Sequence, residues 1–327
     1  MKSMRNCAYL AVGVLLSLSL ATTNPARAVS DPQAGNVVAV PPNINLFIYY
    51  NDVVGSGTVT TTNGTNLNHT RLALDANVFR YIHTMSIGGY VAGTDVVVPI
   101  VSYLGDQKVN GEEVPHKSGF GQPNFGLVFW PINQPKAGNY ILLHGWISPP
   151  ISSFSKITPL TGPELNPANN VLTEDIEIGA RTRLFGSQTT PNVAIEGWYD
   201  AYFYQNNPNF AAVNLPAPGG FAPADVTFRE QPTQELRAYL TYTFEPRIGA
   251  FGAVGFYQSF GGKQTLRIAG VPQAIDTGNR TNESQLRFFL TSFVSPSVQA
   301  GIYLYYDIAA HGGPEQRVLG LRVVKAF

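Results

Sequence analysis

The connections between β-type segments constrain the fold of this chain more than any other feature of its sequence. Segments of about the length of a tilted bilayer strand have β composition at 43–53, 69–81, 85–98, 121–131, 139–149, 173–185, 192–204, 232–244, 246–259, 282–294, 297–308 and 315–327. The connections between them alternate between long and short almost throughout. An antiparallel barrel in a membrane requires this alternation, because short turns lie on one side and long loops on the other.

The long connections are 54–68, 99–120, 150–172, 205–231 and 260–281. The short ones include 82–84, 186–191, Glu245 and Ser295-Pro296. A soluble β protein, the main alternative, has no reason to sort its loops by length in this way. We therefore expect an all-β fold, a transmembrane antiparallel β-barrel of about 12 strands with short periplasmic turns and long extracellular loops.

Composition agrees with a membrane barrel. Charged residues make up 13% of the chain, against about 25% in soluble domains, and aromatic residues make up 12%. After residue 28, no stretch is apolar for long enough to form a membrane helix. Without Lys2, Arg5 and Arg27, the 21 basic residues fall to 18 against 21 acidic ones, a net charge of −3. This balance gives no indication of nucleic-acid binding.

The first 28 residues have the three parts of a secretory signal peptide: a basic start, an uncharged stretch with an apolar centre, and small residues that predict cleavage after Ala28. The chain is thus divided into a signal peptide (1–28), an N-terminal segment (29–42) that is either a periplasmic tail or a plug, and a barrel (43–327). Cys7, the only cysteine, lies in the signal peptide, so the mature chain is expected to form no disulfide.

Apolar and charged residues alternate along several segments. In 173–185, Ile176 and Ile178 alternate with Asp175, Glu177 and Arg181. Charges in the middle of a strand, opposite an apolar face, point to water or to one another, so they are expected to line the lumen while the apolar face meets lipid. The alternation is expected to slip near Gly93-Thr94-Asp95, where we place a β-bulge.

The predicted pore-lining set consists of charged and aromatic residues: His144, Trp146, Asp175, Glu177, Arg181, Arg183, Glu196, Trp198, Asp200, Tyr202, Glu235, Arg237, Tyr239, Arg287, Tyr303, Tyr305 and Asp307. The same reasoning adds Asp75 and Arg247 to the lumen charges. The near balance of signs favours cross-strand ion pairs that fill and stiffen the interior. The other interpretation is a narrow open pore in which the rings offer apolar faces to an aromatic solute.

Catalytic and metal sites are not expected. The five histidines, His69, His83, His116, His144 and His311, stand at no spacing that sets two ligands on one strand face or one helical turn. The chain also contains no Gly-x-Ser-x-Gly motif, and no serine and histidine lie close together on a lipid-facing strand. We therefore expect no enzymatic activity, no metal and no cofactor.

Short motifs punctuated by glycine and proline occur at 41–50 (PPNINLFIYY), 93–100 (GTDVVVPI), 119–126 (GFGQPNFG) and 322–327 (RVVKAF). In these motifs the chain resembles the outer-membrane proteins named after the meta pathway of phenol degradation. The resemblance covers most of the mature chain. It implies a barrel in the outer membrane of a Gram-negative bacterium that passes hydrophobic or aromatic compounds.

The sequence thus predicts a porin-like outer-membrane channel for passive uptake of a small hydrophobic or aromatic solute. The alternative is a structural or adhesive barrel with a closed lumen, whose purpose is its long loops. The expected partners are outer-membrane lipid and the barrel assembly machinery, and Phe327 is expected to form part of the assembly signal. Phe327 also joins Phe129 and Phe244 in an expected aromatic girdle near the short turns. The oligomeric state stays open.

Overall fold

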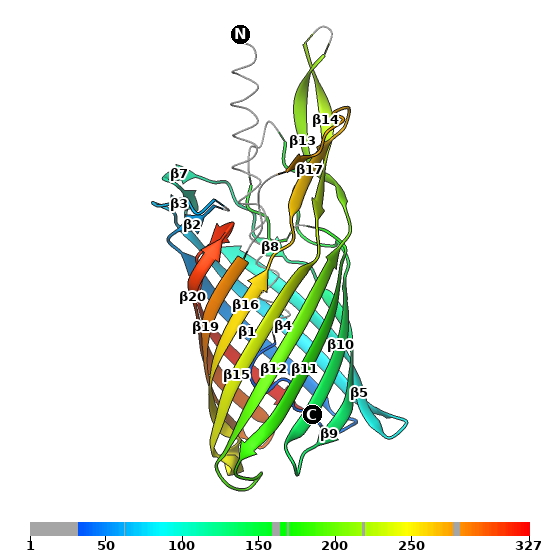
Figure 1. The fold of residues 1–327 in the computed structure, drawn as a ribbon, viewed down its shortest axis with the longest axis vertical. Coiled ribbons are helices and arrows are strands. Elements are labelled where there is room, and N and C mark those ends of the chain that lie inside the picture. Colours follow the sequence, from blue (N-terminus) through cyan, green and yellow to red (C-terminus); the bar gives the residue numbers. More distant parts are fainter. Residues whose placement is uncertain (1–31, 62, 159–163, 169, 218–219, 277–281) are drawn as a thin grey trace.

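The structure, a computed structural model, describes residues 32–61, 63–158, 164–168, 170–217, 220–276 and 282–327. Its main body is a closed antiparallel barrel (Figure 1). Within the described ranges, twelve strands form the barrel wall: β1 (Asn45–Ser56), β4 (Leu72–Ile87), β5 (Tyr90–Tyr103), β9 (Asn124–Gln134), β10 (Asn139–Ser148), β11 (Thr173–Phe185), β12 (Asn192–Tyr204), β15 (Thr233–Glu245), β16 (Ala250–Phe260), β19 (Asn282–Ser295), β20 (Val298–His311) and β22 (Arg317–Ala326).

Each wall strand pairs with the wall strands before and after it in the chain. The first and last strands close the ring, since β1 pairs with β22 from Leu46 opposite Ala326 to Gly55 opposite Arg317. Beyond β22, the backbone of Phe327 exchanges two hydrogen bonds of 3.0 Å with Asn45 and so extends this seam. The predicted twelve-stranded antiparallel barrel is confirmed, and its strands overlap the predicted segments throughout.

The two faces of the wall have opposite chemistry because side chains alternate along each strand. On β11, Ile176 and Ile178 point outward and are 55% and 42% exposed. Between them, Asp175 and Glu177 point inward and are 5% and 3% exposed. The barrel is therefore apolar outside and polar inside, the reverse of a water-soluble domain.

The short turns lie at one end of the barrel and the long loops at the other (Figure 1). Gly88 and Gly89 join β4 to β5 in a two-residue turn and have φ angles of +57° and +85°, which glycine adopts without steric cost. The 3-10 helix η2 (Pro246–Ile248) joins β15 to β16 at the same end. Figure 1 places the C-terminus at this end as well.

The long loops carry small strands: β2 (Val59–Thr60), β3 (Asn66–Leu67), β6 (Lys108–Val109), β7 (Glu112–Glu113), β8 (Gly119–Phe120), β13 (Asn207–Ala217), β14 (Gly220–Glu230), β17 (Gln264–Ile268), β18 (Ile275–Asp276) and β21 (Gly313–Pro314). The hairpin β13/β14 rises beyond the barrel and pairs with β17 and β18 in a separate sheet (Figure 1). This sheet has its own apolar core around Phe210, Phe228 and Leu266, three side chains that are almost fully buried.

The bulge predicted near Gly93-Thr94-Asp95 is wrong. The registers of β5 with β4 and with β9 run through these residues without a shift. The predicted segment 85–98 in fact contains the turn at Gly88-Gly89, so its two halves belong to antiparallel strands, and the alternation changes there. The short turn predicted at 82–84 lies inside β4 for the same reason.

Two lumen charges were also misplaced. Asp75 lies on the outward face of β4, where its carboxylate accepts hydrogen bonds of 2.5 Å from Asn51 and 3.0 Å from Asn77. Arg247 is exposed in the turn η2 rather than in a strand, because β16 begins only at Ala250.

No helix among the described residues is long and apolar enough to cross a membrane. The predicted signal peptide, 1–28, lies outside the described residues.

Candidate functional site

The candidate site is the interior of the barrel, where buried charges come from neighbouring strands. Arg80 on β4 donates to both oxygens of Asp95 on β5, with N–O distances from 2.6 to 3.1 Å. Across the next strands, the His144 ring lies 3.8 Å from Asp95 through Nε2 and 3.4 Å from Glu177 through Nδ1. The same ring stacks on Trp146, with the centroids 3.9 Å apart. Arg80, Asp95, His144 and Glu177 therefore form one chain of buried polar side chains that runs from β4 and β5, past β9, to β10 and β11.

A second group of charges surrounds Arg237 on β15. Its guanidinium donates to Asp200 on β12 and, at 2.5 Å, to Glu235 on its own strand. Glu235 also accepts hydrogen bonds from the hydroxyls of Tyr257, at 2.9 Å, and Tyr202, at 3.4 Å. Because Arg237, Asp200 and Glu235 are all nearly inaccessible to water, each charge depends on the others for its stabilisation.

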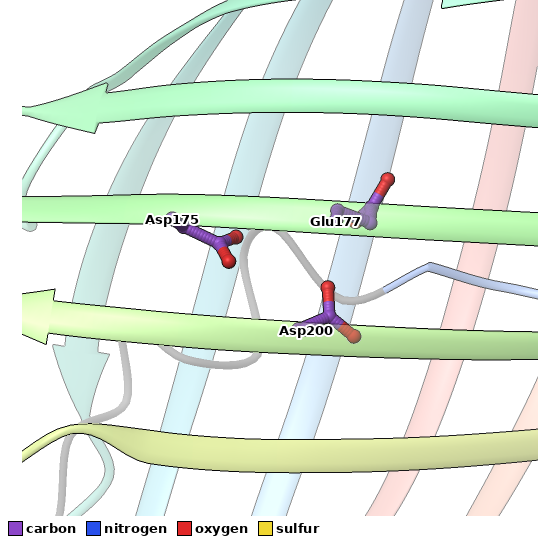
Figure 2. Close-up of side chains that lie close together, drawn as sticks. All are labelled: Asp175, Glu177 and Asp200. Carbon is purple, nitrogen blue, oxygen red and sulfur yellow. The ribbon is translucent and has the colours of Figure 1, made fainter.

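Three carboxylates meet between these two groups. Asp175 and Glu177 project from β11 and Asp200 from β12, on the same face of the wall (Figure 2). One oxygen atom from each lies within 4.8 Å of the others. We refer to Asp175, Glu177 and Asp200 as the acidic trio.

The opposite part of the lumen is aromatic. The rings of Phe289, Tyr303 and Tyr305 lie with their centroids 5.1 to 5.8 Å apart, and Tyr239 meets Phe289 edge-on at 5.5 Å. The Arg287 guanidinium carbon lies 4.2 Å from the centroid of the Tyr257 ring and 4.4 Å from that of Tyr305. This side of the lumen thus offers ring faces and a cation held against them.

Residues 32–39 lie against these inward-facing side chains. Glu196 accepts two hydrogen bonds, at 2.8 and 3.1 Å, from the backbone N–H of Gly35. Trp130 donates to the carbonyl of Val37 at 2.9 Å, and Tyr239 donates to the carbonyl of Pro32 at the same distance. We call residues 32–39 the inner segment. Its Ala34 and Val37 side chains pack into one apolar cluster with Trp130, Tyr140, Leu142 and Trp198.

The predicted pore-lining residues fall into three places. Most are buried on the inward face in the groups described above: His144, Trp146, Asp175, Glu177, Glu196, Trp198, Asp200, Tyr202, Glu235, Arg237, Tyr239, Arg287, Tyr303 and Tyr305. Arg181 lies beside them and pairs with Glu196. Arg183 lies at the short-turn end, where it donates to the carbonyls of Pro135 and Lys136. Asp307 lies toward the long loops and accepts a 2.5 Å hydrogen bond from the backbone of Gln316.

The ion pair between Arg80 and Asp95 and the rings Tyr257 and Phe289 were not among the predicted pore-lining residues. A turn at Gly88-Gly89 sets Arg80 and Asp95 on the same, inward face of two neighbouring strands. The two adjacent glycines were therefore the sequence signal that could have revealed this ion pair. Phe327 has an exposed ring, 63% accessible, and its backbone pairs with β1. Phe129 and Phe244 also lie on the outward face near the short turns. The ring of Phe129 packs against that of Tyr90, with the two ring centroids 5.4 Å apart.

The chain is similar to known proteins in sequence and in fold. The model of the family described as "Putative MetA-pathway of phenol degradation" matches residues 55–323. Among solved structures, the chain is similar to the COG4313 outer membrane channel from Pseudomonas putida F1, with a TM-score of 0.71 and 17% identity over 91% of this chain and 100% of that one. The transport unit of the autotransporter AIDA-I from Escherichia coli matches at a TM-score of 0.48, with 7% identity over 96% and 98% of the two chains. None of the curated proteins matches significantly.

Proposed function

Since the chain belongs to this phenol-degradation family, we propose that it is a narrow outer-membrane channel through which a small hydrophobic or aromatic solute diffuses. We orient the barrel in the outer membrane with its short turns facing the periplasm and its long loops facing the outside of the cell. The proposal requires no catalytic step. Its partners are the lipid around the apolar outer face and the solute in the lumen.

The observation that carries the proposal is the way in which the lumen is filled. The inner segment is held by hydrogen bonds from single side chains, such as those of Trp130 and Tyr239, and not by pairing with a wall strand. It can therefore move without breaking the barrel sheet. A wall of twelve strands is wider than the eight-stranded barrel that side chains alone can fill. Displacement of the inner segment would leave a passage.

The aromatic side of the lumen supports the solute class. The rings of Tyr303, Tyr305 and Phe289 are arranged for offset contacts with a further ring, and Arg287 adds a guanidinium plane next to them. A phenol-like molecule could stack on the rings and donate a hydrogen bond from its hydroxyl to a nearby carboxylate such as Glu235, whose partner Tyr257 packs against Arg287. The family description, which refers to phenol degradation, points to the same class.

Two observations favour the second candidate, a closed barrel that displays its loops. The ion pairs of Arg237 and Arg80 cross from strand to strand, and the hairpin β13/β14 projects beyond the wall with a core of its own. We rank this candidate second because a closed barrel does not need a separately held inner segment.

Single-channel recording distinguishes the two. The full mature protein is refolded in detergent, its folding is verified by heat-modifiable mobility on gels, and its conductance in a planar bilayer is compared with that of a variant lacking residues 32–39. We expect small steps from the wild type, larger steps from the deletion variant, and interruption of both by added phenol. Aliphatic alcohols of similar size serve as the control solutes.

Silence from both folded proteins would overturn the channel and leave the closed barrel with its loops. Steps that phenol and the aliphatic alcohols interrupt equally would retain the channel and remove the aromatic solute.

A further inference from the structure

The acidic trio arises directly from the register of two strands. Asp175 and Glu177 are two residues apart on β11 and so share its inward face. On β12, Asp200 lies directly opposite Glu177. Like charges directly opposite each other destabilise a sheet, and burial strengthens their repulsion because no water screens it. This arrangement needs a compensating positive charge.

No described residue forms a direct ion pair or hydrogen bond with Asp175. Both of its carboxylate oxygens are inaccessible to solvent and lack a hydrogen-bond partner there, and the residue is only 5% exposed. One oxygen of Asp200 is in the same condition. Leaving a buried carboxylate without a partner is one of the costliest arrangements in a protein. The two oxygens of Asp175 and the one of Asp200 therefore indicate a site for a positively charged ligand.

The neighbouring arginines do not balance the charge. Arg80 is engaged with Asp95, and Arg237 bonds to Asp200 and Glu235. Within the described part of the lumen, two guanidinium groups therefore serve five carboxylates, namely Asp95, Asp175, Glu177, Asp200 and Glu235. The excess negative charge is concentrated on the acidic trio. A single divalent cation would neutralise most of this negative charge.

From this geometry we propose that the acidic trio binds a divalent cation of the calcium class, at a site inside the same lumen through which the solute is proposed to pass. Calcium takes oxygen ligands at about 2.3–2.6 Å, so two ligands of one ion lie within about 5 Å of each other. The oxygens of the trio, within 4.8 Å of one another, satisfy this limit. Magnesium dehydrates reluctantly and keeps several of its waters, so a buried site with room for about one water molecule favours calcium.

The surroundings can complete the coordination. A cavity of about 30 Å³ adjoins the trio at Glu177, and its lining also includes His144, Asn36 and Asp95. A site of this size and polarity can hold a water molecule that serves as a further ligand. Asp175 is the third residue of β11 from the long-loop end, so the ion would reach the trio from that side. Bound there, it would bridge β11 to β12.

Terbium luminescence tests the site, because Tb³⁺ replaces Ca²⁺ on oxygen ligands and emits when a nearby tryptophan is excited. Trp146 lies opposite Asp175 on β10, and Trp198 is two residues from Asp200 on β12. The refolded full mature protein is stripped with EDTA and titrated with Tb³⁺, and the bound Tb³⁺ is then displaced with Ca²⁺ or Mg²⁺. We expect saturable emission that Ca²⁺ removes at lower concentration than Mg²⁺.

The variants localise the site. Asp175→Asn keeps the shape of the side chain but removes its charge, and we expect it to weaken Tb³⁺ and Ca²⁺ binding about tenfold or more, since ligand charge sets affinity. Glu174→Gln is the matched control, because Glu174 is the next residue of the same strand and is exposed on the outward face. We expect it to bind like the wild type.

Emission that Asp175→Asn leaves unchanged, or that Glu174→Gln weakens equally, would overturn the site. If Asp175→Asn does not fold, calorimetric titration of the wild type with Ca²⁺ decides. Absence of saturable Ca²⁺ binding to the folded, EDTA-stripped wild type would mean that protons shared among the carboxyl groups neutralise the trio. The binding assay does not depend on conductance, so its outcome is separate from that of the channel proposal.

Discussion

At the scale of single residues, the interior charges depend most on Arg237. Its guanidinium contacts Asp200 and Glu235, and its side chain is 1% exposed. Removing one partner of a buried ion pair costs more than the pair itself contributes, because the remaining charge stays buried. Arg183 provides the contrast, since it carries the same charge on β11 but bonds to turn carbonyls at the short-turn end.

We expect Arg237→Met to reduce the free energy of unfolding by about 3–5 kcal/mol, because it leaves two buried carboxylates without their cation. Urea unfolding in detergent micelles, followed by tryptophan fluorescence, measures the change. The control, Arg183→Gln, should change stability by less than about 1 kcal/mol. Equal stability of the Arg237→Met variant and the wild type would show that Asp200 and Glu235 do not need this guanidinium.

At the scale of elements, the inner segment and the wall meet through a few side chains, of which Tyr239 is the most informative. Its hydroxyl donates to the carbonyl of Pro32 and accepts from Arg287 at 3.2 Å. The ring itself packs against Phe289. Removal of the hydroxyl alone therefore loosens the inner segment while the aromatic contact stays in place.

Tyr239→Phe should raise the single-channel conductance, or the frequency of large openings, because the inner segment loses one of its bonds to the wall. Loss of one hydrogen bond of about 0.5–1.5 kcal/mol predicts an open population roughly two to ten times larger. Tyr242→Phe is the control, since Tyr242 lies on the same strand but faces outward and is 51% exposed. Indistinguishable records from the two variants would contradict a gating role for the inner segment.

The elements also show what sequence reasoning could reach. β-type composition predicted the wall strands, and for several of them, such as β11 and β12, period-two alternation also predicted the faces because one face had to be apolar. The turn at Gly88-Gly89 was misplaced because the residues before it, such as Ile82 and Thr84, fit a strand as well as a turn. The hairpin β13/β14 was missed because its proline-rich and alanine-rich sequence does not alternate.

The contacts inside the lumen were harder to predict than the wall. Strand alternation predicts whether a side chain faces the lumen or the lipid, but it does not predict which side chain it contacts across the barrel. The bonds of Gly35 and Val37 to Glu196 and Trp130 join residues more than ninety positions apart and follow no local pattern. The acidic trio depends on the register between β11 and β12, which the length of their turn alone did not fix.

At the scale of the whole molecule, the lumen has an acidic excess. Among the described inward-facing residues, the carboxylates are Asp52, Asp95, Asp175, Glu177, Glu196, Asp200, Glu235, Glu283 and Asp307, and the arginines are Arg80, Arg181, Arg237, Arg287 and Arg322. A negative lumen attracts cations and excludes anions. The channel proposed above should therefore be cation-selective.

The reversal potential in a KCl gradient, recorded with EDTA present, should indicate a cation-to-anion permeability ratio above about 2. Added Ca²⁺ should lower this ratio by neutralising the acidic trio, and the Asp175→Asn variant should show a smaller response to Ca²⁺. Anion preference in EDTA would contradict the acidic lumen, and an equal response of the variant and the wild type would separate the Ca²⁺ effect from the trio.

The apolar outer face of the wall limits the surroundings in which the chain can reach its native fold. Residues such as Ile176, Leu240 and Val254 remain about half exposed in the finished barrel, so folding does not hide them. In water, even the native structure would aggregate through this belt. The chain can therefore become native only where lipid or detergent covers that surface.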